Sequence, residues 1–295
     1  MTSVLRLQGR LFCGLSLALV IAFMAGARLD PRHELMSVGV LVLLLGVPHG
    51  AFDVVFARKL FVVAGLKKWG IFSLLYAGLS AAVVGVWWVA PTIFLCAFLA
   101  FSALHFGADL ATGVSKLSRV LYGGAVIVLP AVWHGAELQR LLGLVAGPAS
   151  AAFIAPALSL LAVPWLCATA LACALEAKAS PLAACELAAL AAVAVTAPPL
   201  VAFTVYFCAM HSPRHILRTL AHLQGAEARS ALAMALWPTL AALGAAVWVG
   251  TLAQGLPLEN RVMQVIFVGL AGLTLPHMLL LEQARRTHLL SARRK

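Results

Sequence analysis

The chain has 295 residues, of which 63% are hydrophobic and 11% are Asp, Glu, Lys or Arg. Soluble domains carry about 25% charged residues, so this composition, with a mean hydropathy of +1.01, excludes a soluble fold. The net charge of +11 lies in short clusters between apolar runs, which argues against nucleic-acid binding and favours anchoring beside a bilayer. We therefore expect residues 1–295 to form a single multi-pass domain in the inner membrane.

The apolar runs predict an all-α fold, a polytopic transmembrane helix bundle. A membrane-crossing helix needs about 20 mostly apolar residues, and about ten segments of the chain meet that requirement. In chain order the expected spans are residues 11–27, 35–56, 70–90, 92–110, 118–134, 153–175, 182–197, 200–221, 231–252 and 262–281. The Pro198-Pro199 pair separates the seventh and eighth spans, because two consecutive prolines cannot continue a helix.

The basic residues predict the orientation of these spans. Arg6 and Arg10 place the N-terminus in the cytoplasm, and an even number of crossings brings the basic tail after residue 284 to the same side. Residues 135–152 are then expected to form an outer loop. An alternative for the first span is a signal peptide cleaved near Ala25-Gly26-Ala27, which would leave the remaining topology unchanged.

Five histidines fall at one expected depth inside this bundle. They lie on the second, fourth, eighth and tenth spans, all running from outside to inside: His49, His105, His211, His215 and His277. At about 1.5 Å of rise per residue, each is ~17–23 Å below the outer end of its span. Ionisable side chains at this depth are costly and usually functional. We predict that they meet on a common axis and form a buried metal site.

Local spacing supports this interpretation. His211 and His215 are four residues apart and so share one helix face. Asp53 follows His49 by four residues, and Asp109 follows His105 by four, so each carboxylate is expected on the same helix face as its histidine, one turn deeper. Such acids can orient histidines or bind the metal themselves. Imidazole ligands suit Fe, Cu, Zn or Ni. The alternative is that these histidines simply bond neighbouring helices.

The remaining histidines lie in expected loops or at span ends and are left out of the site: His33, His134, His222 and His288. Five aromatic residues flank the predicted site and are candidates to line a substrate channel: Phe52, Phe101, Phe106, Tyr206 and Phe207.

The motifs GVPHGAFD, HFGAD, HSPRH and LPH together resemble the Brp/Blh family of bacterial membrane β-carotene 15,15′-dioxygenases, over about residues 35–282. The resemblance implies that O₂ cleaves β-carotene, or a related carotenoid, at the central double bond to give two retinal molecules, with non-haem Fe(II). It maps the iron ligands to His49, His105, His211 and His215. His277 matches a further histidine, either a fifth ligand or a hydrogen-bond donor.

Other functions stay open from the residues alone. A metal or proton transporter could relay ions through the histidines with Asp53 and Asp109, although those spans have no acid or histidine in their outer halves. A retinal-binding pump would need a lysine at mid-membrane, and every lysine lies in an expected loop, span edge or tail.

Overall fold

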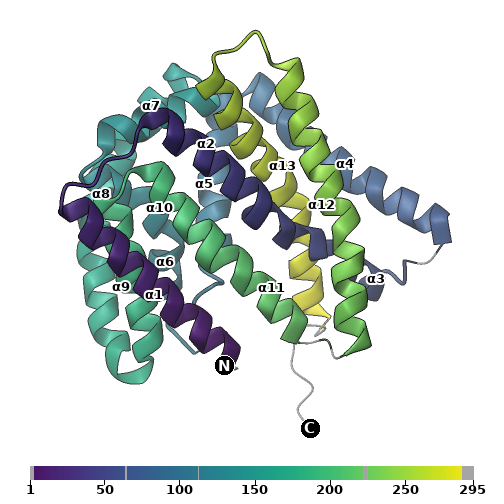
Figure 1. Cartoon of the computed structure of the whole chain (residues 1–295), viewed down its shortest axis with the longest axis horizontal. Coiled ribbons are helices and arrows are strands. Elements are labelled where there is room, and N and C mark those ends of the chain that lie inside the picture. Colours follow the sequence, from purple (N-terminus) through teal and green to yellow (C-terminus); the bar gives the residue numbers. More distant parts are fainter. Residues whose placement is uncertain (1–2, 64, 112, 222, 224, 288–295) are drawn as a thin grey trace.

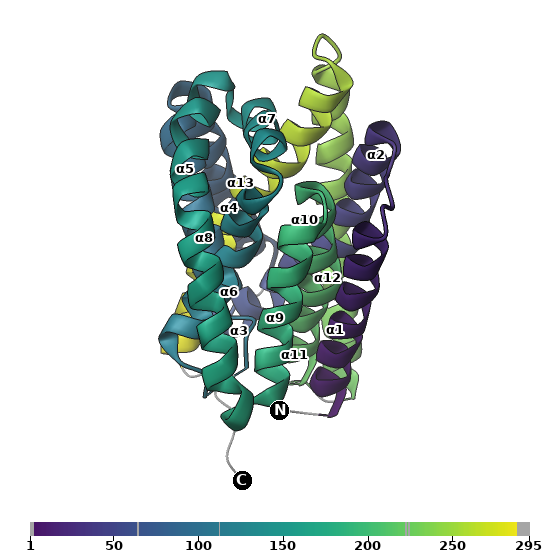
Figure 2. The same cartoon turned by 90° about the vertical axis from the view of Figure 1, so that its left-hand side faces the viewer.

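A computed structural model describes residues 3–63, 65–111, 113–221, 223 and 225–287, so His222 and His288 lie outside the described residues. The described residues form helices and turns only, which confirms the all-α prediction. The helices lie side by side in an elongated bundle (Figures 1 and 2). The start of α1 (Ser3–Met24) and the end of α13 (Leu258–Arg286) lie at the same end of the bundle (Figure 2).

The described residues include six helical segments that are long and apolar enough to cross a membrane. They are α1, the composite segment Pro31–Leu60, α4 (Gly65–Val89), α8 (Pro148–Ala179), α12 (Ala226–Leu252) and α13. A seventh arises if Lys116–Val132 and Gly135–Ala146, bent by 115°, count as one span. The chain is thus a multi-span membrane protein, and the larger number of about ten spans stays a prediction.

Three further helical segments of the described chain correspond to expected spans but do not qualify as long apolar helices. Two are shorter apolar helices, α5 (Pro91–Phe106) and α9 (Pro181–Thr196). The third comprises α10 (Pro199–Val205), the π-helical segment η4 (Tyr206–His211) and α11 (Ser212–Ala221). The expected outer loop 135–152 is wrong: α7 (Gly135–Ala146) fills most of it. Leu138, Leu141, Leu142 and Val145, which are three or four residues apart along one helix face, are buried against the bundle.

Prolines determine where many of these helices begin. A proline stands in the first turn of α2 (Pro31–Leu41), α5, α8, α9 and α10. Proline is favoured there because the first backbone N–H groups of a helix have no partner inside the helix, so its missing N–H costs nothing. The predicted break at Pro198-Pro199 is present, with α9 ending at Thr196 and α10 starting at Pro199.

Two segments depart from regular α-helix. The composite second segment contains a π-helical turn η1 (Val42–Gly46) and a 3₁₀ turn η2 (Val47–Phe52) before α3 (Asp53–Leu60). The eighth predicted span contains η4. Turns of this kind inside helices often occur at functional sites. Here they carry His49 and His211.

The described helices differ in how closely they pack against their neighbours. α5 and α6 (Lys116–Val128) approach so closely that a side chain at Gly107 would meet the backbone of Arg119, and one at Gly123 would meet the backbone of Ala103. Small residues of this kind permit tight packing between membrane helices. By contrast, α4 has no buried residue and α12 has only Ala231 and Ala235. These two helices therefore present most of their apolar surface to lipid.

A buried ion pair ties three helices together. Arg214 on α11 donates two hydrogen bonds to the Glu186 carboxylate on α9, at 2.7 and 2.8 Å, and a third to Gln8 Oε1 on α1 at 2.8 Å. Arg214 and Glu186 are fully buried. Two charges in this setting are stable only when paired and hydrogen-bonded. The contact therefore fixes α11, and with it the turn that carries His211 and His215.

Candidate metal centre

The structure brings the five histidine rings of the depth argument together. The ring centroid of His211 lies 4.8 Å from those of both His49 and His105. The ring of His277 lies 5.0–5.4 Å from those of His215, His105 and His49. The rings come from η2, α5, the consecutive elements η4 and α11, and α13, which are four parts of the chain far apart in the sequence.

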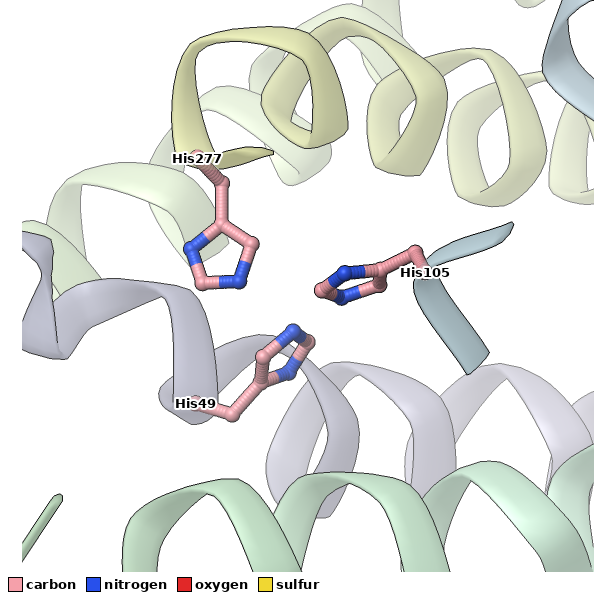
Figure 3. Close-up of side chains that lie close together, drawn as sticks. All are labelled: His49, His105 and His277. Atoms are coloured by element: carbon pink, nitrogen blue, oxygen red, sulfur yellow. The ribbon is translucent and has the colours of Figure 1, made fainter. Parts of the chain in front are cut away.

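The most compact set of possible ligand atoms belongs to His49, His105 and His277. One ring nitrogen of each lies within 4.8 Å of the others. Figure 3 shows the three rings pointing toward a common centre from three different helical elements. The rings of His211 and His215 adjoin this group. A metal ion bound among His49, His105 and His277 would therefore also lie near the imidazoles of His211 and His215.

Hydrogen bonds to Nδ1 orient three of the five rings. His211 Nδ1 donates to Asp109 at 2.8 Å, His277 Nδ1 to Asp53 at 2.7 Å, and His49 Nδ1 to the Gly46 carbonyl oxygen at 2.6 Å. Carboxylate and carbonyl oxygens only accept, so each ring carries its proton on Nδ1. The Nε2 lone pair is then the one available for a metal, the arrangement typical of metal-binding histidines.

Neither aspartate binds the histidine that lies four residues before it. Asp53 binds His277 on α13 instead of His49, and Asp109 binds His211 on η4 instead of His105. The spacing argument assumed a continuous α-helix through each motif. However, Val47–Phe52 is a 3₁₀ turn, and α5 ends at Phe106, so Asp109 lies in the turn beyond the helix. Each carboxylate therefore orients a histidine from another helix.

The Nε2 atoms supply the test of whether a metal fits. Among the described residues, every buried side-chain nitrogen without a hydrogen-bond partner is the Nε2 of a histidine in this cluster: His105, His211, His215 and His277. Leaving one buried polar atom unpaired costs about 1–3 kcal/mol. Because the rings of these histidines adjoin one another, a metal ion bound among them would give these atoms a partner, so the residues present fit a metal.

A network of residues missed by the sequence argument holds Asp109 in place. Tyr206 donates its hydroxyl proton to the Asp109 carboxylate at 2.6 Å. Arg218 donates to the backbone carbonyl oxygens of Ala108 at 2.7 Å and Asp109 at 2.6 Å, and Arg214 donates to the latter at 3.2 Å. The signal in the sequence was the pair Arg214 and Arg218, within and just after the HSPRH motif, inside the expected span 200–221.

Asp53 is held in a similar way. Tyr76 on α4 donates its hydroxyl proton to the second carboxylate oxygen of Asp53 at 2.8 Å. Both aspartates are thus buried, and each binds one histidine and one tyrosine. The contacts of Asp53 use both of its carboxylate oxygens, whereas both contacts of Asp109 fall on Oδ2. Each aspartate thus lies where it orients a histidine ring.

Two of the four histidines that were left out of the predicted site, His33 and His134, lie among the described residues. His134 precedes α7, and its Nε2 lies 3.4 Å from the carbonyl oxygen of Thr196. His33 lies on the surface beside Asp30. Neither ring contacts the cluster.

A small cavity of about 40 Å³ adjoins the cluster and is lined by His49, His105, His211 and His277. Of the five aromatic residues predicted to line a channel, Phe106 and Phe207 border this cavity. Phe52, Phe101 and Tyr206 border none of the cavities described below. The tyrosine instead binds Asp109, and the Phe101 side chain is 47% exposed.

Residues 40–283 of the chain match the family model for beta-carotene 15,15′-dioxygenase. A curated protein named beta-carotene 15,15′-dioxygenase, from uncultured marine bacterium 66A03, is 30% identical over 268 residues, which cover 84% of this chain and 93% of that protein. No solved structure matches the chain.

Proposed function

The chain belongs to the β-carotene 15,15′-dioxygenase family, and from this we propose that it cleaves β-carotene, or a closely related carotenoid, at the central double bond. O₂ is the second substrate and two molecules of retinal are the product. Family membership favours this enzyme over the metal or proton transporter considered from the sequence. The proposed location is the inner membrane.

We further propose that the histidine cluster holds a non-haem Fe(II) ion. The ligands would be His49, His105, His211 and His215, with His277 as a fifth ligand or as a hydrogen-bond donor beside the ion. The observation that carries this proposal is the meeting of the five imidazole rings in the buried core. Three of the four proposed ligands, His105, His211 and His215, have a buried Nε2 without a hydrogen-bond partner, and so has His277. The compact group formed by His49, His105 and His277 supports a direct role for His277 as well.

The chemistry of the substrate supports a redox metal. A polyene has no acidic proton and no electrophilic carbonyl group, so side-chain acids and bases cannot split its C=C bond. Iron on imidazole ligands supplies the activation of O₂ that this reaction needs. The residues of the chain then have three tasks: to position the ion, to hold the rings in one tautomer, and to bind the polyene in an apolar, water-poor cavity.

The polar groups near the site fit these tasks. Asp53 and Asp109 keep the protons of His277 and His211 on Nδ1. Tyr76 and Tyr206 donate to the same carboxylates and so offset the cost of burying their charge. The small cavity beside the histidines is otherwise lined by Phe, Leu and Val side chains, with Ser102 and Thr274. Such a wall suits a hydrocarbon that dissolves in the bilayer.

The function is tested by expressing the chain in cells that make β-carotene and extracting the pigments. We expect loss of orange colour and the appearance of retinal as the only cleavage product. Unchanged β-carotene, with the protein folded and loaded with iron, would refute the proposed function.

A further inference from the structure

A large cavity opens on the lipid-facing side of the metal centre. It has a volume of about 1020 Å³ and lies between η2, α3, α4, α12 and α13. Its lining is mainly apolar, with Trp69 and Phe72 from α4 and Trp237 and Ala241 from α12. The volume is at the upper end of the range for ligand-binding pockets, about 300–1,000 Å³.

The position of this cavity indicates that it is open to the membrane. α4 and α12 pack against α13 but hardly against each other. In Figure 1 both lie at the edge of the bundle, on the side of α13 away from α8 and α9. They are also the least buried of the long helices. A hydrophobic molecule dissolved in the bilayer can therefore reach the cavity between them without crossing water.

Three cavities follow one another through the bundle. The large cavity and the small one beside the histidines share the walls Val47, Gly50 and Leu273. The small cavity shares Phe98, Ser102, Phe106 and Phe203 with a third cavity of about 90 Å³. Leucines of α7, among them Leu138 and Leu142, line this third cavity. The histidines thus face the middle of the series.

Gly50 occupies the junction between the first two cavities. A Cβ atom added there would meet no other atom within 4 Å, and its φ is not in the positive region. Neither backbone conformation nor helix packing therefore requires glycine at this position. Gly46, one turn earlier, differs, because a side chain there would collide with the ring of Phe207. What Gly50 preserves is free space beside His49.

We propose that the three cavities form one channel that binds the whole carotenoid chain, with its leading half in the third cavity and its trailing half in the large one. The inference rests on the proposed function. A bond in the middle of a long molecule can reach a buried centre only if space continues on both sides of that centre. The carotenoid enters between α4 and α12, passes Gly50, and stops where the leucines of α7 close the channel.

On this geometry the closed end sets the position of cleavage. The third cavity is much smaller than the first, so the Leu, Phe and Met side chains around it must move apart to admit the leading half of the chain. The distance from this end to the histidines then determines which double bond lies at the centre. Leu142 lines the third cavity and is not among the residues that line the small cavity beside the histidines.

The passage is tested with Gly50→Leu and, as the conservative variant, Gly50→Ala. Binding is measured on protein freed of metal by chelation, from the visible absorption of β-carotene that remains bound in detergent micelles. Iron content of the reloaded protein is measured in parallel. We expect Gly50→Leu to lower β-carotene binding and cleavage by at least about tenfold, with normal iron content, and Gly50→Ala to have a smaller effect. Full binding and turnover in Gly50→Leu would overturn the channel.

The closed end is tested with Leu142→Phe and the control Leu160→Phe, a position on α8 that is 79% exposed. We expect Leu142→Phe to shift cleavage away from the centre, giving two aldehydes of unequal length, and Leu160→Phe to yield retinal alone. A general loss of stability would change the amount of product but not its length. Retinal as the sole product of a folded, active Leu142→Phe protein would overturn the assignment of this end.

These results are separable from the proposed function. If the unmodified protein cleaves β-carotene and neither variant differs from it, the function stands and the channel is wrong. The competing occupant of the large cavity is a lipid acyl chain. If added phospholipid fully displaces β-carotene from the metal-free protein while cleavage in bilayers continues, the cavity belongs to lipid and the channel is also wrong.

Discussion

Asp109 shows how one hydrogen bond can fix the orientation and the tautomer of a histidine ring in the candidate metal centre. Asp109 accepts from His211 Nδ1 and from Tyr206, and Arg218 holds the backbone of the same turn. The carboxylate therefore fixes both the tautomer and the direction of the imidazole. Loss of such partners typically lowers metal affinity or activity by about 10–100-fold.

We accordingly expect Asp109→Asn to weaken iron binding by about 10–100-fold. The amide oxygen can still accept from Nδ1, but it lacks the negative charge that makes the imidazole a better ligand. Metal titration of the purified protein measures the change. Asp30→Asn, in an exposed turn before α2, serves as the control. Equal affinity in both variants would contradict the orienting role of Asp109.

Among the histidines, His49 and His134 make an informative pair. We expect His49→Ala to abolish both iron binding and cleavage, because it removes a ring from the centre of the cluster. We expect His134→Ala to keep both, because its ring only approaches the Thr196 carbonyl outside the cluster. Iron content and retinal yield check each variant. Normal turnover in His49→Ala, or its loss in His134→Ala, would count against the site.

At this scale the sequence predicted which histidines meet but not how they are held. The expected depth of each histidine was enough to predict that their rings meet, because parallel spans bring residues of equal depth into one layer of the bundle. The aspartate partners depended on local helix geometry, and the 3₁₀ turn at Val47–Phe52 and the end of α5 at Phe106 changed the direction of both carboxylates. Tyr76 was not identified, because nothing in its own segment relates it to Asp53.

At the scale of helices, α5 packs closely against α6 just before the turn that contains Asp109. We expect Gly123→Ala to lower the free energy of unfolding by about 1–3 kcal/mol, because the new methyl group would press on the backbone at Ala103 and Gly107. Gly244→Ala on α12 is the matched control, since its methyl group would meet no atom within 4 Å. Thermal unfolding in detergent distinguishes the two. Equal melting temperatures would refute this contact.

The beginnings of helices were more predictable from the sequence than their interiors. Proline marks the start of five helices and the break before α10, for a reason that depends only on the local backbone. The π and 3₁₀ turns around His49 and His211 have no comparable local signal. The helix α7 was also missed, because a short amphipathic helix lying against the bundle does not satisfy a criterion built on length and continuous hydrophobicity.

For the molecule as a whole, the arrangement of its ends bears on topology. The start of α1, the turn between α8 and α9, and the end of α13 lie at one end of the bundle (Figure 2). The basic residues Arg6, Lys178 and Arg285 belong to these elements or adjoin them. Positive charge of this kind accumulates on the cytoplasmic side. The prediction that both termini are cytoplasmic rests on this distribution.

Reporter fusions test this orientation. A fluorescent protein fused after residue 287 is expected to fluoresce in the cytoplasm, and alkaline phosphatase at the same position to be inactive. Fusion at Gly255, between α12 and α13, should reverse both signals, because one fewer helix then crosses the membrane. Active phosphatase at residue 287 would contradict the orientation.

The unequal cavities on the two sides of the histidines have a consequence for turnover. When a symmetric polyene is cut at its midpoint, the fragments are chemically identical but their surroundings are not. The fragment beside α4 and α12 can diffuse directly into the bilayer, whereas its twin beneath α7 must first travel back past the histidines. The two aldehydes would therefore depart one after the other, and the slower departure would limit how soon the next carotenoid can be accepted.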